Sequence, residues 1–349
     1  MFVRCIAERY PTTSFQIYTS SAYAQPFQRI SNITNFCRVG RFIDRVCNKT
    51  IGKQIGKRCL ERNADATVHI GGSIFIEPEH FVPPREYYSN PNLYIIGCNY
   101  GPSKTEAYYD YIWTRLQKAQ DVCFRDGYSY GMFSSLKHVR VAPDVLFGYP
   151  DYPAPKKGHG VGISVISLDE RPGLKHMADA YYRSIAQVID QCAQRDVSVK
   201  LFGFCSDEGD RTAIEHIKNR CKTGKFEICE YDGNIDGMLD DINACEYMIA
   251  SRFHAMIIGW CLSKKVFPVV YSDKQLHVMD DVGYTGDYWD LREKKEYTAE
   301  SIICNIHEAV TFRVDEYKRQ SKLHFNKLDD YLKNSVTIGE NKSEDAERS

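Results

Sequence analysis

Short apolar runs alternate with longer amphipathic segments along most of this chain. The runs include 66–70 and 93–96 in the first half, and GISVIS and VKLFGF in the second. Between them, segments such as 108–119 and 175–194 carry apolar residues at helical spacing. Buried strands that are separated by helices pair in parallel, because each connection must cross back over the sheet. The alternation therefore predicts an α/β fold built on parallel sheets.

A proline-rich stretch between residues 143 and 159 interrupts this alternation, which then starts again. Such a stretch is typical of a linker. We therefore expect the following organisation: a Rossmann-like domain over 1–150, a linker over 151–158, a second Rossmann-like domain over 159–298, C-terminal helices over 299–333 and a polar, disordered tail over 334–349. In such folds, ligands bind beyond the carboxyl ends of the strands or in the cleft between two halves. Residues that directly follow strands therefore carry most of the functional information.

Composition limits the partners of the chain. The formal net charge of −1 gives no global field that would recruit nucleic acid, so an anionic ligand must be held by local cations. The 13 cysteines include no CxxC pair, which favours reduced thiols in a cytoplasmic protein over disulfides or a zinc site. The sequence has no transmembrane run, no metal-ligand motif and no nucleotide-binding glycine loop. We expect no metal and no cofactor.

The stretch ASRFHAMIIGW places polar residues between a predicted strand and a predicted helix over 252–263. Ser251 is expected at the N-cap, with Arg252 and His254 in the first turn. A helix N-terminus offers free N–H groups to an anion, and the Arg252 guanidinium would add a bidentate clamp. A bound anion would favour a protonated His254, which could then donate a proton. In the alternative interpretation, the two side chains only cap and solvate the start of a helix.

Other loops after strands supply further candidates. Lys274 follows the strand in VFPVVYSDK, so its loop could face the same cleft as His254. Arg125 follows the strand in DVCFRDGYS, where a local salt bridge is the alternative role. Glycine loops after two earlier strands could let the backbone approach a ligand. The candidates in these loops are Gly71, Gly72, Asn99 and Gly101.

Taken together and in order, the motifs HIGGSIF, IIGCNYGPS, FRDGYS, APDVLF, GISVISL, SRFHA and YSDK resemble those of the polysaccharide pyruvyl transferases. That family resembles the GT-B glycosyltransferases in fold, with two Rossmann-like domains facing a cleft. The likeness covers roughly residues 1–300. SRFHA, the RDxxS-like FRDGYS and a lysine 20 residues after the histidine form a specific combination.

The resemblance implies transfer of pyruvate from phosphoenolpyruvate to a sugar hydroxyl of a cell-surface glycan or its precursor. The usual products are a cyclic ketal and phosphate. By similarity, His254 would be the general acid, and Arg252, Arg125, Lys274 and Ser251 would bind the donor. The second domain would then hold the donor and the first the acceptor. A lipid-linked acceptor would bring the protein to a membrane surface.

The start of the sequence departs from the family pattern. Family members open with a strand and a GNxGD-type loop, whereas this sequence begins with MFVRCIAERYP, which looks like the end of the first helix. We therefore expect the first domain to lack that strand, through a clipped start or through divergence. Two alternative functions follow: a GT-B glycosyltransferase that uses a nucleotide sugar, and a non-catalytic glycan-binding member.

Overall fold

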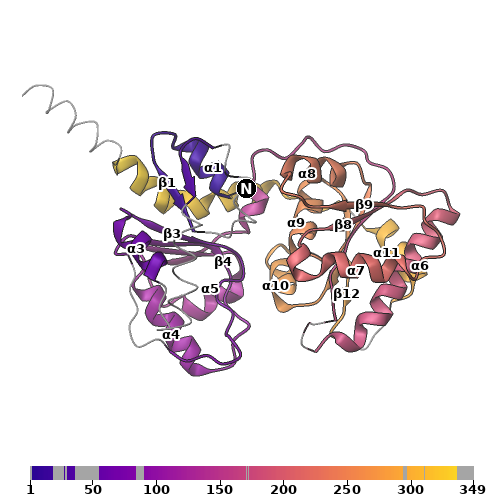
Figure 1. Ribbon diagram of the computed structural model, residues 1–349, viewed down its shortest axis with the longest axis horizontal. Helices are drawn as coiled ribbons and strands as arrows, with labels where there is room; N and C mark the ends of the chain where they lie inside the picture. The colour runs from indigo at the N-terminus through magenta and orange to yellow at the C-terminus, as the bar shows by residue number, and fades with distance from the viewer. Residues whose placement is uncertain are drawn as a thin grey trace, which may run out of the picture. The chain divides into compact units, whose positions relative to one another are not determined.

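The computed structural model describes residues 2–18, 27, 30–35, 55–83, 90–169, 171, 173–293, 297–309 and 311–335. The chain divides into two compact units (Figure 1). Unit 1 comprises Met1–Tyr149 and Lys318–Ser349, and unit 2 comprises Pro150–Tyr317. The predicted tail lies outside the described residues from 336 onward. No helix among the described residues is both long and apolar enough to cross a bilayer.

Unit 1 is built on a four-stranded parallel sheet in the order β3-β4-β5-β6. Its strands are β3 (Thr67–Ile70), β4 (Leu93–Cys98), β5 (Asp121–Phe124) and β6 (Val139–Val141). Its described helices include α1 (Phe2–Arg9), α3 (Ile55–Asn63), α4 (Glu106–Gln117) and α5 (Gly127–Phe133). A separate parallel pair joins β1 (Phe15–Ile17) to β2 (Ile33–Asn35). Every residue of β4 is buried, which explains its continuous apolar sequence.

The C-terminal segment predicted as one helical block over 299–333 is divided between the two units. Helix α11 (Ala299–Glu308) packs in unit 2, whereas the chain returns to unit 1 at Lys318. This return takes place within α12 (Asp315–Ser321). The 3₁₀ turn η6 (Lys322–Phe325) comes next, and a helix then continues over 326–335. The segment returns because its apolar side chains are buried there, where they complete a core cluster with α1 and β4. The buried members of that cluster are Ile6, Tyr10, Tyr94, Ile96, Phe325, Leu328 and Leu332.

His324 lies within this returning segment and is completely buried. Its Nε2 is 2.9 Å from the carbonyl oxygen of Pro143. Burial lowers the pKa of His324 to about 4, with the Asp144 carboxylate opposing this shift and Arg140 adding to it. The imidazole is therefore neutral in the folded protein at pH 5, whereas an unfolded histidine, with a pKa of about 6.5, is protonated there.

This difference predicts acid sensitivity of unit 1. As the pH falls from about 6.5 towards 4, the unfolded state takes up a proton that the folded state does not, so stability is lost. Between pH 7 and pH 5, the wild type should lose about 2 kcal/mol more free energy of unfolding than His324→Gln. Urea titrations followed by circular dichroism measure this difference, with His176→Gln, at an exposed position of unit 2, as the control. Equal losses in wild type and His324→Gln would contradict the prediction.

Unit 2 is built on a six-stranded parallel sheet in the order β12-β11-β10-β7-β8-β9. Its strands are β7 (Val161–Ser164), β8 (Val199–Gly203), β9 (Glu227–Glu230), β10 (Tyr247–Ala250), β11 (Lys265–Val270) and β12 (Trp289–Asp290). The chain runs outward from β7 to β9 and then returns to place β10 beside β7. The order of the strands thus reverses between β7 and β10. In open α/β sheets, the carboxyl ends at such a switch point are where ligands bind.

The helices of unit 2 are α6 (Ala178–Gln194), α7 (Asp210–Lys218), α8 (Ile235–Asn243), α9 (Phe253–Cys261), α10 (Asp273–Asp281) and α11. Helix α9 follows β10 directly, and His254 is its one residue that is not buried. An almost fully apolar helix is stable only when it is covered by protein on nearly all sides. The exposed imidazole in its first turn is therefore an exception to the pattern of the whole helix.

Candidate functional site

The switch point of unit 2 is held together by two buried serines at the ends of β7 and β10. The backbone N–H of Ser251 donates to the carbonyl oxygen of Ser164 (3.3 Å), and that of Arg252 donates to the Ser164 Oγ (3.1 Å). The Ser251 hydroxyl lies 2.8 Å from the Tyr181 hydroxyl. The prediction that Ser251 caps α9 is therefore wrong. Its side chain is used by Tyr181 and its backbone still follows the sheet, so Arg252 occupies the N-cap position instead.

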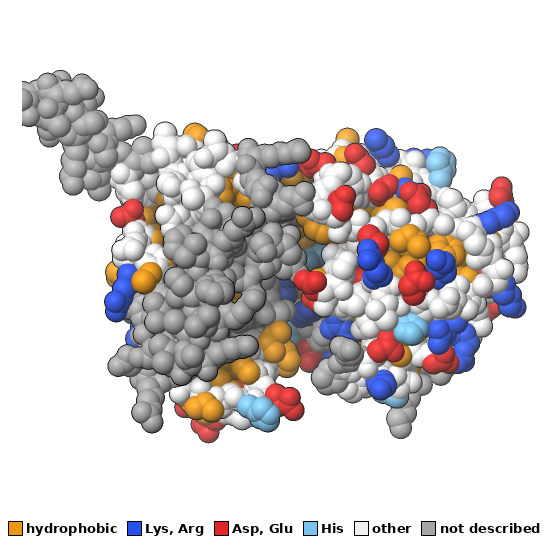
Figure 2. Space-filling view, viewed as in Figure 1, with side chains coloured by type: hydrophobic (Ala, Val, Ile, Leu, Met, Phe, Trp, Pro, Cys, Tyr) orange, Lys and Arg blue, Asp and Glu red, His pale blue; other side chains and the backbone are white. Residues whose placement is uncertain are grey.

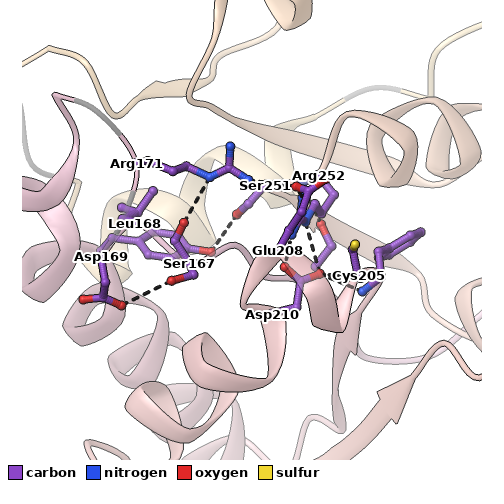
Figure 3. Close-up of polar contacts among 12 residues, drawn as sticks. Ser167, Leu168, Asp169, Arg171, Cys205, Glu208, Asp210, Ser251 and Arg252 are labelled. Atoms are coloured by element: carbon purple, nitrogen blue, oxygen red, sulfur yellow. Dashed lines mark hydrogen bonds and ion pairs between the residues drawn. The ribbon is translucent and has the colours of Figure 1, made fainter. Parts of the chain in front are cut away.

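The Arg252 side chain makes a paired contact with the carboxylate of Asp210, which begins α7 (Figure 3). Nε donates to one carboxylate oxygen at 3.1 Å and Nη2 to the other, while Nη1 donates to Glu208. Asp210 also accepts the backbone N–H groups of Phe204 (2.8 Å) and Cys205 (2.9 Å). Burial disfavours the charge of Arg252, but Asp210 and Glu208 outweigh it and hold its pKa above the ordinary value. The guanidinium is therefore charged and firmly positioned.

Two further cations lie beside the Tyr271 ring, which follows β11. The Arg171 guanidinium is 4.6 Å from the ring centroid, and the Lys274 ammonium is 5.2 Å from it. Arg171 also donates to the carbonyl oxygen of Ser167 (3.1 Å) and to Glu208 (3.0 Å). Lys274 lies in the first turn of α10. Within the described part of the chain its ammonium forms no salt bridge, and it lies 5.9 Å from the Phe253 ring.

His254 and Lys274 thus both lie near the ring of Phe253. The His254 ring meets Phe253 edge to face at 5.4 Å between centroids, and it is exposed to solvent. An exposed imidazole and an ammonium that both lie near one phenylalanine ring, at the carboxyl ends of parallel strands, are groups that can bind an anion and transfer a proton to it. Of the residues predicted from the sequence, the structure brings Ser251, Arg252, His254 and Lys274 together in unit 2.

Arg125 belongs to a separate polar cluster in unit 1. It follows β5, and its buried guanidinium donates to Asp144 (3.0 Å) and to the Asn99 side-chain oxygen (2.7 Å). A Cβ atom at Gly72 would lie 2.4 Å from Arg125 Nη1, so only glycine leaves room for this side chain. The structure therefore brings Gly72, Asn99 and Arg125 together. Gly71 and Gly101 have φ values of 140° and 92°, and glycine is needed there for the backbone itself.

Four contributors to these clusters were missed by the sequence analysis. Asp144 lies within the quoted APDVLF motif, where it accepts from the Leu146 N–H at 2.9 Å, but the motif gave no sign of its bond to Arg125. Arg171 could have been found as a cation soon after a strand. Glu208 and Asp210 resemble ordinary acidic residues at the start of a helix. Only the strand order places them beside Arg252.

Other polar features of unit 2 lie at the opposite, amino ends of the strands. A pocket of about 300 Å³ is lined by residues from the start of β8 and β9, including Lys200, Lys225 and Glu227. Ligand atoms of Glu227, Cys229 and Asp241 are close enough to hold a metal ion. The Lys200 ammonium, however, lies 2.6 Å from Asp241 and 3.3 Å from Glu227, so both carboxylates are already paired with a lysine. On the visible face of unit 2, basic and acidic side chains are interspersed (Figure 2).

Comparisons with known proteins agree with this architecture. The family model for polysaccharide pyruvyl transferases matches residues 6–273. A structure described as a UDP-N-acetylglucosamine 2-epimerase from Listeria monocytogenes is 9% identical with a TM-score of 0.51, covering 91% of this chain and 85% of that one. UDP-GlcNAc 2-epimerase from Methanocaldococcus jannaschii is 8% identical with a TM-score of 0.46, covering 89% of this chain and 98% of that one.

The structure of TarM is 10% identical with a TM-score of 0.44. The alignment covers 70% of this chain and 50% of TarM, so the chain spans half the length of that protein. At 9% identity, the likeness to the Listeria monocytogenes structure shows the fold alone. No curated protein sequence matches the chain.

Proposed function

This chain belongs to the polysaccharide pyruvyl transferase family and has its two-domain, GT-B-like α/β fold, and we therefore propose that it transfers pyruvate from phosphoenolpyruvate to a sugar hydroxyl. The acceptor is a cell-surface glycan or its lipid-linked precursor, modified in the cytoplasm at the membrane surface. The donor site is formed by the carboxyl ends of β10 and β11. Within unit 1, Arg125 and the loops of Gly71, Gly72, Asn99 and Gly101 are proposed to contact the substrates as well.

The observation that carries this proposal is the exposed His254 in the buried helix α9, associated through Phe253 with the Lys274 ammonium. Phosphoenolpyruvate is an anion that reacts when its methylene carbon gains a proton. Lys274 supplies positive charge for its phosphate or carboxylate, and the protonated imidazole of His254 supplies the proton. Arg252 contributes charge while Asp210 fixes its position.

The reaction then follows from this protonation. Transfer of the proton to the methylene carbon leaves an oxocarbenium-like centre at C2, and an acceptor hydroxyl attacks it and loses its own proton. In ketal formation, a second hydroxyl of the same sugar displaces phosphate from C2. The first C–O bond to the sugar replaces the π bond between C2 and the methylene carbon, and the second replaces the bond from C2 to the phosphate oxygen. Phosphate is therefore the leaving group, and no oxidant is required. The scheme uses no cofactor.

Lys274→Met tests the donor site. Phosphoenolpyruvate at saturating concentration should raise the melting temperature of the wild type by several degrees, because it binds the folded state. In Lys274→Met this shift should fall to less than half, while the melting temperature without ligand stays close to the wild-type value. Lys265→Met is the matched control, because Lys265 also lies over a tyrosine ring, that of Tyr247 (5.5 Å), but at the amino end of β11.

Turnover is measured as phosphate release from phosphoenolpyruvate in the presence of candidate saccharides. Stabilisation by a UDP-sugar and none by phosphoenolpyruvate would support the nucleotide-sugar glycosyltransferase instead. Stabilisation by saccharides alone, without phosphate release, would support a non-catalytic glycan-binding protein.

A further inference from the structure

Glu208 differs from the other carboxylate that contacts Arg252. Asp210 is 1% exposed and accepts from two backbone N–H groups as well as from Arg252, so it belongs to the framework of the site. Glu208 lies at the end of the short 3₁₀ turn η5 (Ser206–Glu208), and its side chain is 53% exposed. Water can therefore reach the Glu208 carboxylate, whereas the Arg252 side chain beneath it is only 8% exposed.

One oxygen of Glu208 is shared by two guanidinium groups. Oε2 accepts from Arg171 Nη2 at 3.0 Å and from Arg252 Nη1. The two arginines come from different loops, one after β7 and the other after β10, on either side of the switch point. Two guanidinium groups that converge on one solvent-facing oxygen form the arrangement that proteins use for phosphate or carboxylate ligands.

The charges around this oxygen also favour an anion. Arg171, Arg252 and Lys274 contribute three positive charges, and Asp210 and Glu208 contribute two negative ones, which leaves +1. Without Glu208 the same group carries +2. This sum leaves out two carboxylates that contact other groups: Asp169 accepts from the Tyr182 hydroxyl (2.8 Å), and Asp273 pairs with Arg292.

We propose that Glu208 acts as an internal anion that occupies the place of a substrate phosphate or carboxylate oxygen between Arg171 and Arg252. The ligand displaces the Glu208 side chain and takes over both guanidinium groups, which makes Arg171 an anion-binding residue. Asp210 stays in place and keeps Arg252 oriented during the exchange. The ligand class is a small phosphate or carboxylate anion; its identification as phosphoenolpyruvate rests on the proposed function.

Glu208→Gln tests the proposal with inorganic phosphate as the probe. Glutamine keeps the size and one oxygen acceptor but removes the charge that competes with the ligand. In isothermal titrations at constant ionic strength, Glu208→Gln should bind phosphate roughly three- to tenfold more tightly than the wild type. Arg171→Gln should bind it more weakly by a similar factor. Glu215→Gln is the matched control, because Glu215 is an exposed residue of α7 that pairs with Lys218, at 3.8 Å.

The outcomes separate this inference from the proposed function. Unchanged or weaker phosphate binding by Glu208→Gln, in a variant that melts like the wild type, would overturn the inference and leave Glu208 as a support for Arg252. If that result came with turnover of phosphoenolpyruvate, the proposed function would be supported and only the inference about Glu208 would be wrong. Tighter phosphate binding without turnover of phosphoenolpyruvate by any variant would support the inference and contradict the proposed donor.

Discussion

Arg252→Met is expected to lower the free energy of unfolding of unit 2 by about 3–5 kcal/mol, because removing one partner of a buried ion pair leaves the other charge without compensation. Asp210 would keep its two backbone N–H donors but lose both guanidinium contacts, although its side chain is only 1% exposed to water. The substitution conserves much of the apolar volume of the side chain. The loss therefore reports the unpaired carboxylate rather than a cavity. Urea unfolding of the purified variant measures it.

Two further variants show whether this explanation is correct. Arg252→Met combined with Asp210→Asn should recover part of the lost stability, because the second change removes the uncompensated charge. Arg171→Gln should cost less than about 1 kcal/mol, because Arg171 pairs with Glu208 at a partly exposed position. If Arg252→Met lost no more free energy of unfolding than Arg171→Gln, the prediction would be contradicted. For the same reason, reduced activity of an Arg252 variant can be interpreted as lost substrate binding only if the variant is shown to be folded.

His254→Ala is expected to have the opposite profile, with a large effect on catalysis and a small effect on stability. The rate of pyruvate transfer should fall by about 10²–10⁴-fold, the usual contribution of a positioned general acid. The free energy of unfolding should change by less than about 0.5 kcal/mol, because the side chain is exposed on a helix whose other residues make the packing contacts. Phosphate release and urea unfolding, measured on the same preparation, check both parts.

His307→Ala is the control for this experiment. His307 is also exposed in unit 2, but it contacts the Tyr247 hydroxyl (3.2 Å) at the amino end of β10, the end opposite to the proposed donor site. The control should keep the wild-type transfer rate. A loss of more than about 2 kcal/mol in His254→Ala, with the transfer rate of the remaining folded protein unchanged, would show that His254 is a structural residue.

The sequence predicts the strands of this fold better than the details of its polar contacts. Continuous apolar runs gave β4, β10 and β11, because strands buried on both faces need such runs. The sequence predicts that α9 begins at Arg252, whereas it begins at Phe253, since the capping rule cannot show that Tyr181 already uses the Ser251 hydroxyl. The rule describes local chemistry, and here a tertiary contact overrides it.

Contacts that depend on the order of the strands could not be predicted. Asp210 lies 42 positions before Arg252 and meets it only because β10 pairs with β7, and β7 with β8. Residues 318–335 show a similar limit. A helical pattern indicates that one face must be covered, but it does not indicate which part of the chain covers it.

The return of the C-terminal segment to unit 1 has a consequence for how the protein is made. Ile6, Tyr94 and Ile96 are synthesised early, but the side chains that complete their cluster, Phe325, Leu328 and Leu332, leave the ribosome more than 200 residues later. Unit 2 is encoded as one continuous segment and has all of its own sheet by then. During translation, the second unit can therefore fold first, while the first keeps part of its apolar surface uncovered and open to chaperones.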